Sequence, residues 1–248
     1  MKAMVLAAGL GTRLRPLTDD KPKALVTVGG RTLLEIALER LRGLGVTEAI
    51  VNVHHFAEMV CAYLEENGNF GMRVEISREQ ELLDTGGGLK KAAWFFLEGG
   101  ADGDEPFLVH NVDVISAIDL DAMMRLHVER KALATLAVQR RETSRPLIFD
   151  AEGQLRGRGA AKQLADAGME TLAFCGIHAV SPRIFAKLNE EGLGEPGAFS
   201  IIDAYVRLAG QGETIQGFRA DGAYWRDLGR PENVAQAEQE LRGGAMPA

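Results

Sequence analysis

A glycine-rich loop near the start of the chain holds a concentration of positive charge. Gly9 and Gly11 follow a short apolar stretch of sequence. Within fifteen residues of Gly9 the chain carries four cationic residues, Arg13, Arg15, Lys21 and Lys23. A glycine turn lets backbone N–H groups approach a phosphate or a nucleobase closely, since no side chain intervenes. Positive charge gathered beside such a turn is what a triphosphate site needs.

Other interpretations of this glycine loop can be compared with the sequence. A Walker A loop requires the pattern GxxxxGK[ST], which the chain lacks. A dinucleotide fingerprint requires GxGxxG, but Leu14 stands at its third glycine position, where close helix packing needs a glycine. A glycine turn beside solvated lysine and arginine side chains is the remaining alternative. From the loop alone, this alternative stays open.

The loop is set in an alternating series of apolar segments. Residues 3–8 are continuously apolar, which predicts a buried strand that runs into the loop. Further strands are expected at 49–53, 72–76 and 107–111, and helices at 33–41, 56–64 and, after a loop containing three glycines at 86–88, through 94–96. This alternation implies βαβ crossovers and a mainly parallel sheet with helices on both faces.

The second half of the chain is richer in strands. Residues 147–156 predict a hairpin with its turn at 150–153. Strands are also expected at 133–139, 171–180, 214–218 and 223–226, and helices at 120–130, 182–188, 200–208 and 231–241. The predicted fold class is therefore α/β: a Rossmann-like three-layer sandwich with a mainly parallel mixed sheet and a smaller β-rich region.

Composition excludes several classes of partner. Lys and Arg number 28 against 35 Asp and Glu, a formal charge of -7, which is unfavourable for binding nucleic acid or an anionic membrane. No apolar stretch is long enough to span a bilayer, and the N-terminal apolar run is too short for a signal peptide. Cys61 and Cys175 form no CxxC pattern, which fits a reducing cytoplasm. We expect a cytoplasmic protein.

Five segments together resemble the sugar-phosphate nucleotidyltransferase family. The glycine loop with Lys21-Pro22-Lys23 is similar to the family signature. Four later segments follow at family-like spacing: Asp84-Thr85-Gly86-Gly87, Asn111-Val112-Asp113, Phe174-Cys175-Gly176-Ile177 and Trp225-Arg226-Asp227-Leu228-Gly229. The resemblance covers nearly the whole chain. The chain is short and lacks a Glu-Lys-Pro segment. It is therefore most similar to the compact N-acetylmuramate-1-phosphate uridylyltransferases and mannose- or heptose-1-phosphate guanylyltransferases.

The resemblance implies a reaction and roles for the cationic loop. A sugar phosphate oxygen attacks the α-phosphorus of a nucleoside triphosphate in line, and pyrophosphate leaves. Two polyanions must meet, so positioning and charge neutralisation dominate catalysis. The implied catalytic residues are Arg13, at the β- and γ-phosphates, and Lys23, at the α-phosphate and the sugar phosphate. The implied nucleotide-binding set is Ala8, Gly9, Gly11, Thr12, Arg13, Lys23, Glu79, Thr85 and Gly86.

Asp113 and Asp227 are the candidate metal ligands. Both follow predicted strands, where open α/β sheets bind their ligands. Taken singly, each is more typical of a helix N-cap or a turn. The resemblance pairs them as ligands of Mg²⁺, which prefers hard oxygen atoms. Val112 stands between Asn111 and Asp113 where the family usually has glycine, so a Cβ could narrow access to the backbone there.

The base and the sugar are less well defined by the sequence. Glu79 could accept from N3–H of a pyrimidine or from N1–H and the amino group of guanine, and a charged surface loop is an equal alternative. Asn111 and Gly176 match family positions near the sugar, and Gly176 would let the sugar approach the backbone. The segment around Glu79 therefore does not determine which nucleobase binds.

The predicted function is transfer of a nucleotidyl group to a sugar 1-phosphate, with UTP and N-acetylmuramate 1-phosphate as first choice. Guanylyl transfer to mannose or heptose 1-phosphate is the alternative within the class, and a nucleotide-binding regulatory module without turnover is the alternative outside it. An NAD-binding oxidoreductase fails on Leu14 and on the cationic loop. We expect one domain over residues 1–248, with a nucleotide-binding part at about 1–130 and a sugar-binding, metal-completing part at about 131–242, in a monomer or small homo-oligomer.

Overall fold

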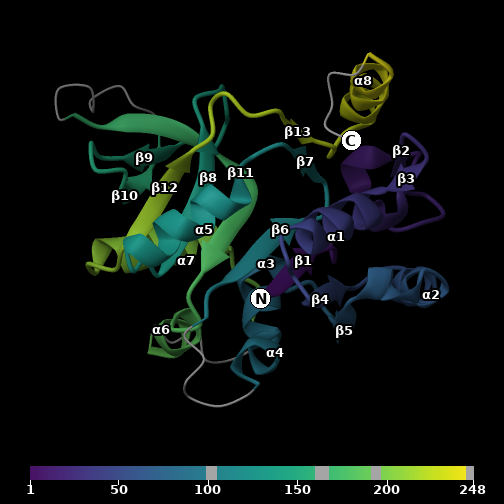
Figure 1. Cartoon of the computed structure of the whole chain (residues 1–248), viewed down its shortest axis with the longest axis horizontal. Helices are drawn as coiled ribbons and strands as arrows, with labels where there is room; N and C mark the ends of the chain where they lie inside the picture. The colour runs from purple at the N-terminus through teal and green to yellow at the C-terminus, as the bar shows by residue number, and fades with distance from the viewer. Residues whose placement is uncertain (99–104, 160–167, 191–196, 244–248) are drawn as a thin grey trace. The chain divides into compact units, whose positions relative to one another are not determined.

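The backbone contacts of the chain group into two compact units. The computed structural model describes residues 1–98, 105–159, 168–190 and 197–243. The first unit consists of Met1–Leu83, Val109–Ile118 and Ala223–Ala248, and the second of Asp84–Leu108 and Asp119–Gly222. The chain therefore passes between the units several times (Figure 1). The division into parts at about residue 130 stays a prediction.

The first unit is built on parallel strands. β1 (Lys2–Leu6) pairs in parallel with β4 (Glu48–Val53), which pairs in parallel with β5 (Arg73–Arg78). β6 (Phe107–Asn111) lies next to β1 on its other side. The middle of β1 is fully buried, as its continuous apolar sequence predicts. The expected strand–helix alternation is confirmed here.

Helices connect these parallel strands. α1 (Leu33–Gly43) begins after Thr32, whose hydroxyl accepts a hydrogen bond from the Glu35 N–H at 3.1 Å. Its apolar side chains at helical spacing are all buried, namely Leu33, Leu34, Ala37, Leu38 and Leu41. α2 (Ala57–Glu66) follows β4 and leads through η3 (Gly68–Gly71) into β5. Both predicted helices are present.

Short antiparallel pairs complete the first unit. β2 (Thr27–Val28) pairs with β3 (Arg31–Thr32), and β7 (Val114–Ser116) pairs with β13 (Trp225–Asp227). α8 (Pro231–Arg242) lies beside the β2–β3 hairpin (Figure 1), where the Gly29 N–H donates to Glu238 Oε1 at 2.8 Å. The short strand β7 was not expected from the sequence, and it directly follows Asp113.

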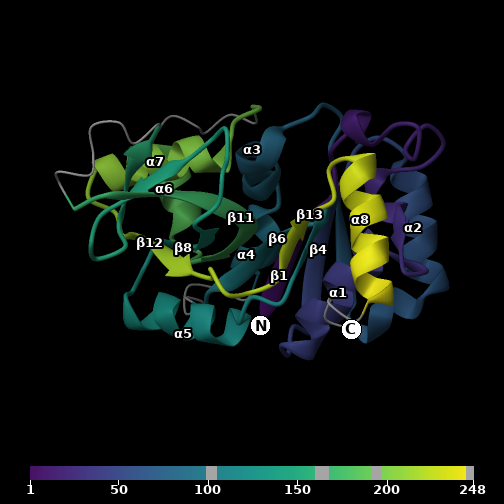
Figure 2. The same ribbon diagram turned by 90° about the horizontal axis from the view of Figure 1, so that it is seen from above.

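The second unit contains a mixed sheet. β8 (Ala134–Gln139) pairs antiparallel with β11 (Glu170–Val180) and parallel with β12 (Ile215–Arg219). β9 (Leu147–Phe149) and β10 (Leu155–Arg158) form the predicted hairpin, and β9 also pairs with β11. The helices α5 (Leu120–Glu129), α6 (Ile184–Glu190) and α7 (Ile201–Gly210) belong to this unit and lie near their expected positions (Figure 2).

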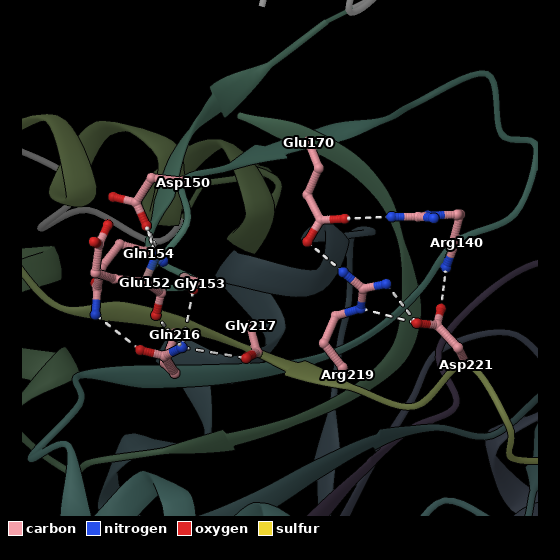
Figure 3. A network of polar contacts seen from close by, with 10 residues as sticks. All are labelled: Arg140, Asp150, Glu152, Gly153, Gln154, Glu170, Gln216, Gly217, Arg219 and Asp221. Atoms are coloured by element: carbon pink, nitrogen blue, oxygen red, sulfur yellow. Dashed lines mark hydrogen bonds and ion pairs between the residues drawn. The ribbon is translucent and has the colours of Figure 1, made fainter. Parts of the chain in front are cut away.

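A network of ion pairs joins the ends of the strands in the second unit (Figure 3). Glu170, at the start of β11, accepts a hydrogen bond from Arg140 Nη2 at 3.2 Å and another from Arg219 Nη1. Asp221 accepts the backbone N–H of Arg140 at 2.5 Å and the Nε–H of Arg219 at 2.9 Å. Each cation in this network is neutralised by a carboxylate of the same unit.

The glycines at 86–88 lie in a helix, and the loop expected there is wrong. They belong to α3 (Asp84–Lys91), which is followed by α4 (Ala93–Leu97). A Cβ at Gly86 would overlap the Phe199 ring, and the Gly86 N–H donates to the Phe199 carbonyl at 2.9 Å. Close packing against this ring therefore explains the glycine despite its poor helix propensity. Among the described residues, no helix combines the length and apolarity that a membrane span requires.

Candidate active site

The glycine loop leaves β1 with its backbone open to a ligand. A Cβ at Gly9 would meet nothing within 4 Å. Gly11 has φ +65, and a Cβ there would lie 3.0 Å from Thr18 Cγ2. The Thr18 hydroxyl donates to the Gly11 carbonyl at 2.8 Å, which fixes the turn from inside. Within the described chain, the N–H groups of Gly9 and Gly11 have no recorded acceptor, so they remain available to an anion.

The four cations of the loop divide into two pairs. Arg15 lies 3.4 Å from Asp19, and Lys21 lies 4.0 Å from Asp20, both in exposed pairs at the surface. Pairs of this kind contribute little to stability. Arg13 and Lys23 instead lie near the candidate metal ligands. The sequence alone gave no means of separating these two pairs.

Lys23 points inward and forms an ion pair with Asp113. The ammonium contacts Asp113 Oδ2, and the exposed fractions of the two side chains are only 12% and 15%. Lys23 begins the short helix η2 (Lys23–Leu25), and Asp113 follows β6, so the pair joins two segments ninety residues apart. The ammonium supplies the positive charge that a partly buried carboxylate needs.

Asp227 lies one step along the β7–β13 ladder from Asp113. It pairs with Val114, and the Leu228 N–H donates to the Asp113 carbonyl at 2.8 Å. The Gly229 N–H donates to Asp227 Oδ1 at 2.6 Å, which fixes the carboxylate. A Cβ at Gly229 would lie 2.6 Å from that oxygen and 3.2 Å from Arg13 Nη2. Gly229 therefore leaves room between the Arg13 guanidinium and the Asp227 carboxylate.

The donor set at this place suits Mg²⁺. The carboxylates of Asp113 and Asp227 would supply the hard oxygen donors that Mg²⁺ prefers, beside water and phosphate oxygens. In the described part of the chain, no cluster of three or more His, Cys, Asp or Glu residues offers an all-protein cage. The Lys23 ammonium occupies the position of a counter-cation at Asp113. Val112, the departure from the family pattern, has a buried side chain, and its N–H donates to the Leu6 carbonyl at 3.1 Å.

A buried series of hydrogen bonds lies beneath the loop, and the sequence did not predict it. Asn52 Oδ1 accepts from the Ala7 N–H at 2.7 Å, and Asn52 Nδ2 donates to Glu79 Oε1 at 2.7 Å. Glu79 Oε2 in turn accepts from the Leu83 N–H at 3.0 Å. Glu79 is 5% exposed, so it is not part of a charged surface loop. The only sequence signal was a polar residue at position 52 inside an apolar strand.

The remaining predicted residues lie in different surroundings. Ala8 is buried beside the loop, and Thr12 is exposed at the start of η1 (Thr12–Leu14). Asn111 ends β6. In the second unit, Thr85 Oγ1 accepts from the Ile201 N–H at 3.0 Å, at the start of α7.

Gly176 lies in an irregular part of β11. It has φ +75, and the register of β11 against β8 shifts between Phe174 and His178. A residue with a side chain is strained at this φ, so glycine is required by the bulge itself. Its presence is therefore explained without a sugar, and its contact with a sugar stays a prediction.

The first unit thus has the features of a nucleotide-binding α/β protein. A cationic glycine loop leaves the carboxyl end of a parallel strand, where such sheets bind ligands. Asp113 and Asp227 are close along the backbone, with Lys23 against the first and Arg13 near the second. This combination suits a polyphosphate with its metal ion.

Comparisons with known proteins agree with this class. The family model described as nucleotidyl transferase matches residues 2–243. An N-acetylmuramate alpha-1-phosphate uridylyltransferase from Caulobacter vibrioides is 35% identical, with 96% of each chain covered. A mannose-1-phosphate guanyltransferase beta-B from Xenopus laevis is 29% identical over 94% of this chain and 62% of that protein. A UDP-glucose pyrophosphorylase structure from Acinetobacter baumanii superposes with a TM-score of 0.77 at 19% identity, covering 98% and 97% of the chains.

The chain belongs to the nucleotidyl transferase family and is a sugar-1-phosphate nucleotidyltransferase. The predicted family, fold class and type of reaction are confirmed. The superposed structure, at its low identity, shows the Rossmann-like fold alone.

Proposed function

We propose that the enzyme transfers a uridylyl group from UTP to N-acetylmuramate 1-phosphate and releases pyrophosphate. The supporting observation is the 35% identity to the Caulobacter vibrioides uridylyltransferase over 96% of both chains. The reaction would supply an activated sugar for cell-wall synthesis in the cytoplasm. We also propose that the enzyme is a monomer or a small homo-oligomer.

Arg13 and Lys23 are proposed to bind the reacting phosphates. The Arg13 guanidinium is exposed and, among the described residues, has no recorded carboxylate partner within salt-bridge distance, so its donors are available to the β- and γ-phosphates. Lys23 would neutralise charge on the α-phosphate and the incoming sugar phosphate, which is needed where two anions react. The Gly9 and Gly11 N–H groups and the neighbouring Ala8 and Thr12 would contact the nucleotide.

Asp113 and Asp227 are proposed to hold Mg²⁺. When bound, the ion would offset negative charge on the triphosphate oxygens. Asp113 would then no longer need the Lys23 ammonium as its counter-charge, and the freed Lys23 could turn to the α-phosphate. The ion pair between these residues therefore supports a role for Lys23 that begins only when the substrates are bound.

The base contact is proposed to involve the segment after β5. Glu79 has a hydrogen bond to each carboxylate oxygen, from Asn52 and from Leu83, so a base can use only its remaining lone pairs. The next residue, Gln80, is exposed, and its amide offers both a donor and an acceptor to a pyrimidine edge. Thr85 and Gly86 stay in the proposed nucleotide set, although the Gly86 N–H already donates to Phe199.

The sugar is proposed to contact Asn111 and Gly176. Asn111 lies two residues before Asp113, at the end of β6. Gly176 presents backbone without a side chain at the bulge of β11. These assignments rest on the family pattern, and the positions of both residues at a strand end and a bulge are compatible with them.

Guanylyl transfer to mannose or heptose 1-phosphate is the alternative within the class. The Xenopus laevis mannose-1-phosphate guanyltransferase, at 29% identity, supports it. A nucleotide-binding module without turnover is less well supported, since Lys23, Asp113 and Asp227 are all present and gathered in one unit.

Pyrophosphate release over a matrix of nucleoside triphosphates and sugar 1-phosphates tests the proposal. The matrix should pair UTP, GTP, dTTP and ATP with the 1-phosphates of N-acetylmuramate, mannose, heptose and glucose, with and without Mg²⁺. We expect the highest kcat/KM for UTP with N-acetylmuramate 1-phosphate, and no turnover without a divalent ion. A preference for GTP with mannose 1-phosphate would replace the proposal with its alternative, and inactivity across the matrix would favour the binding module.

A further inference from the structure

A separate cavity of about 490 Å³ lies within the first unit. Its wall comes from the β2–β3 hairpin, α1, β6, β7 and the end of α8. The polar and charged side chains of the wall are Arg31, Glu39, Arg40, Arg42, His110 and Ser116. None of the residues assigned above to nucleotide, sugar or metal lines this cavity. It therefore needs an explanation of its own.

Arg40 is the central cation of this cavity. Its Nη1 donates to Ser116 Oγ at 2.8 Å and its Nη2 to the Ile118 carbonyl at 2.6 Å, both neutral acceptors. A guanidinium has five N–H donors, so others remain free for a ligand. Burial lowers the pKa of Arg40 to about 10, and it stays charged at neutral pH. Within the described chain, no carboxylate is recorded against it.

The cavity has an excess of positive charge in a chain that is acidic overall. Glu39 is the one carboxylate among its lining residues. It pairs with Arg31 Nη2 and lies 3.9 Å from Arg42 Nη2, so it is already shared by two arginines. The Arg40 charge is left over, which favours an anion in the cavity.

His110 contributes a neutral and almost fully buried ring to the same wall. It is 1% exposed, and its Nδ1 lies 2.8 Å from the Asn111 carbonyl, so Nδ1 carries the proton. Burial, and secondarily the nearby charge of Arg40, lower the pKa of His110 to about 4, so the ring is neutral. Nε2 is then a lone-pair acceptor, and it has no hydrogen-bond partner among the described residues. A buried acceptor without a donor is uncommon in native structures.

We propose that this cavity binds a small organic anion. Its oxyanion would accept hydrogen bonds from the donors of Arg40 that Ser116 and Ile118 leave unused. Its hydrocarbon part would contact Val114 and Ile115, which line the wall. Phosphorylated sugars and sugar acids share this chemistry, and they differ in whether the anion is a phosphate or a carboxylate.

The cavity is connected to the candidate metal ligands through the β7–β13 strand pair. Ser116, which binds Arg40, pairs with Trp225 in the β7–β13 ladder, and Val114 pairs with Asp227. Asp113 immediately precedes β7. A ligand against Arg40 therefore lies beside the strand pair that contains Asp227 and that directly follows Asp113. The inference rests on the cavity itself and does not require the proposed substrates.

Binding can be measured without the active site. The full chain carrying Lys23→Ala would be titrated with glucose 6-phosphate, gluconate and inorganic phosphate, following the arginine Nε–H signals by NMR. We expect saturable binding of glucose 6-phosphate or gluconate with a shift of the Arg40 signal, and binding of inorganic phosphate weaker by about 10-fold or more, because it lacks the apolar contacts. The organic probe that binds more tightly shows whether the cavity prefers a phosphate or a carboxylate.

Variants separate the cavity from general charge effects. Arg40→Gln should weaken binding by about 10-fold or more, whereas Arg73→Gln, an exposed arginine of the same unit, should change it less than twofold. Ile36→Glu adds a negative charge at the half-buried wall without removing a recorded hydrogen bond, and should also weaken binding. No saturable binding of either organic probe, equal binding of inorganic phosphate, or unchanged binding in both cavity variants would overturn the proposal.

Discussion

Cationic side chains in the two units of the chain differ in the partners that neutralise them. In the second unit, Arg140 and Arg219 share Glu170 at the ends of neighbouring strands (Figure 3). In the first unit, Arg13 has no carboxylate partner among the residues that the structure describes, and Lys23 pairs with Asp113, a proposed metal ligand. A cluster of cations therefore indicates a phosphate site only when its charges are not already offset by permanent partners.

The largest effect should come from Lys23. Lys23→Ala removes positive charge from the position where two phosphates react, and kcat/KM should fall by about 1,000-fold, or about 4 kcal/mol. Pyrophosphate release with saturating Mg²⁺ measures it. Arg15→Ala is the matched control, because its cation lies in an exposed pair with Asp19, and it should lose less than about threefold. Equal losses in both variants would remove the distinction between inward and surface cations.

His110 should make the stability of the first unit depend on pH. Its folded-state pKa of about 4 lies below the ordinary value of 6.5, so the unfolded chain binds more protons between these values. Stability is therefore full above pH 6.5 and falls as the pH decreases toward 4, by about 3 kcal/mol from this residue. Urea unfolding at pH 7 and pH 4.5 should show a smaller drop for His110→Gln than for wild type. The same drop in both proteins would contradict the assignment.

Asn52→Ala should destabilise the enzyme by about 2–3 kcal/mol, because it leaves the Ala7 N–H and Glu79 Oε1 buried without partners. The glycine loop should also be less well positioned, so KM for the nucleotide should rise. Asn67→Ala is the control: Asn67 is an exposed asparagine of the same unit, and among the described residues its side chain bonds the Tyr63 carbonyl alone. Urea unfolding of both variants tests whether the loss of stability comes from the buried hydrogen bonds of Asn52 or from the loss of any amide side chain.

The smallest effect is expected in the second unit. Arg219→Gln removes a cation from a partly exposed network, and stability should change by less than about 1 kcal/mol. Turnover should stay within about twofold of wild type, since the network's charges are offset within the unit. A large loss of activity would show that these cations act on the substrates and would break the comparison between the units.

Much of the fold follows from local sequence patterns. The apolar run at 107–111 and the periodic helix after Thr32 appear as expected, because each carries its own burial pattern. The glycines at 86–88 indicate a loop from local sequence, because the Phe199 ring that requires a glycine in this helix lies far along the chain. The strand β7 is only three residues long and is defined by its partner β13. Non-local contacts of this kind leave no periodic signal.

The sequence names candidate site residues but does not show how they are arranged. The glycine loop, Lys23 and the two aspartates were identified from spacing and family resemblance. Which cations turn inward depends on partners such as Asp113, ninety residues away from Lys23. The Asn52–Glu79 chain and the room left by Gly229 likewise depend on packing in three dimensions.

The central claim is that Asp113 and Asp227 together hold the metal ion of the triphosphate. Mn²⁺ binding followed by EPR, with a UTP analogue that cannot react at the α-phosphorus, tests it most directly. We expect the dissociation constant for Mn²⁺ to rise by about 10-fold or more in Asp227→Asn, and to be unchanged in Asp221→Asn, a carboxylate of the second unit. Equal Mn²⁺ affinity in Asp227→Asn and wild type would contradict the account.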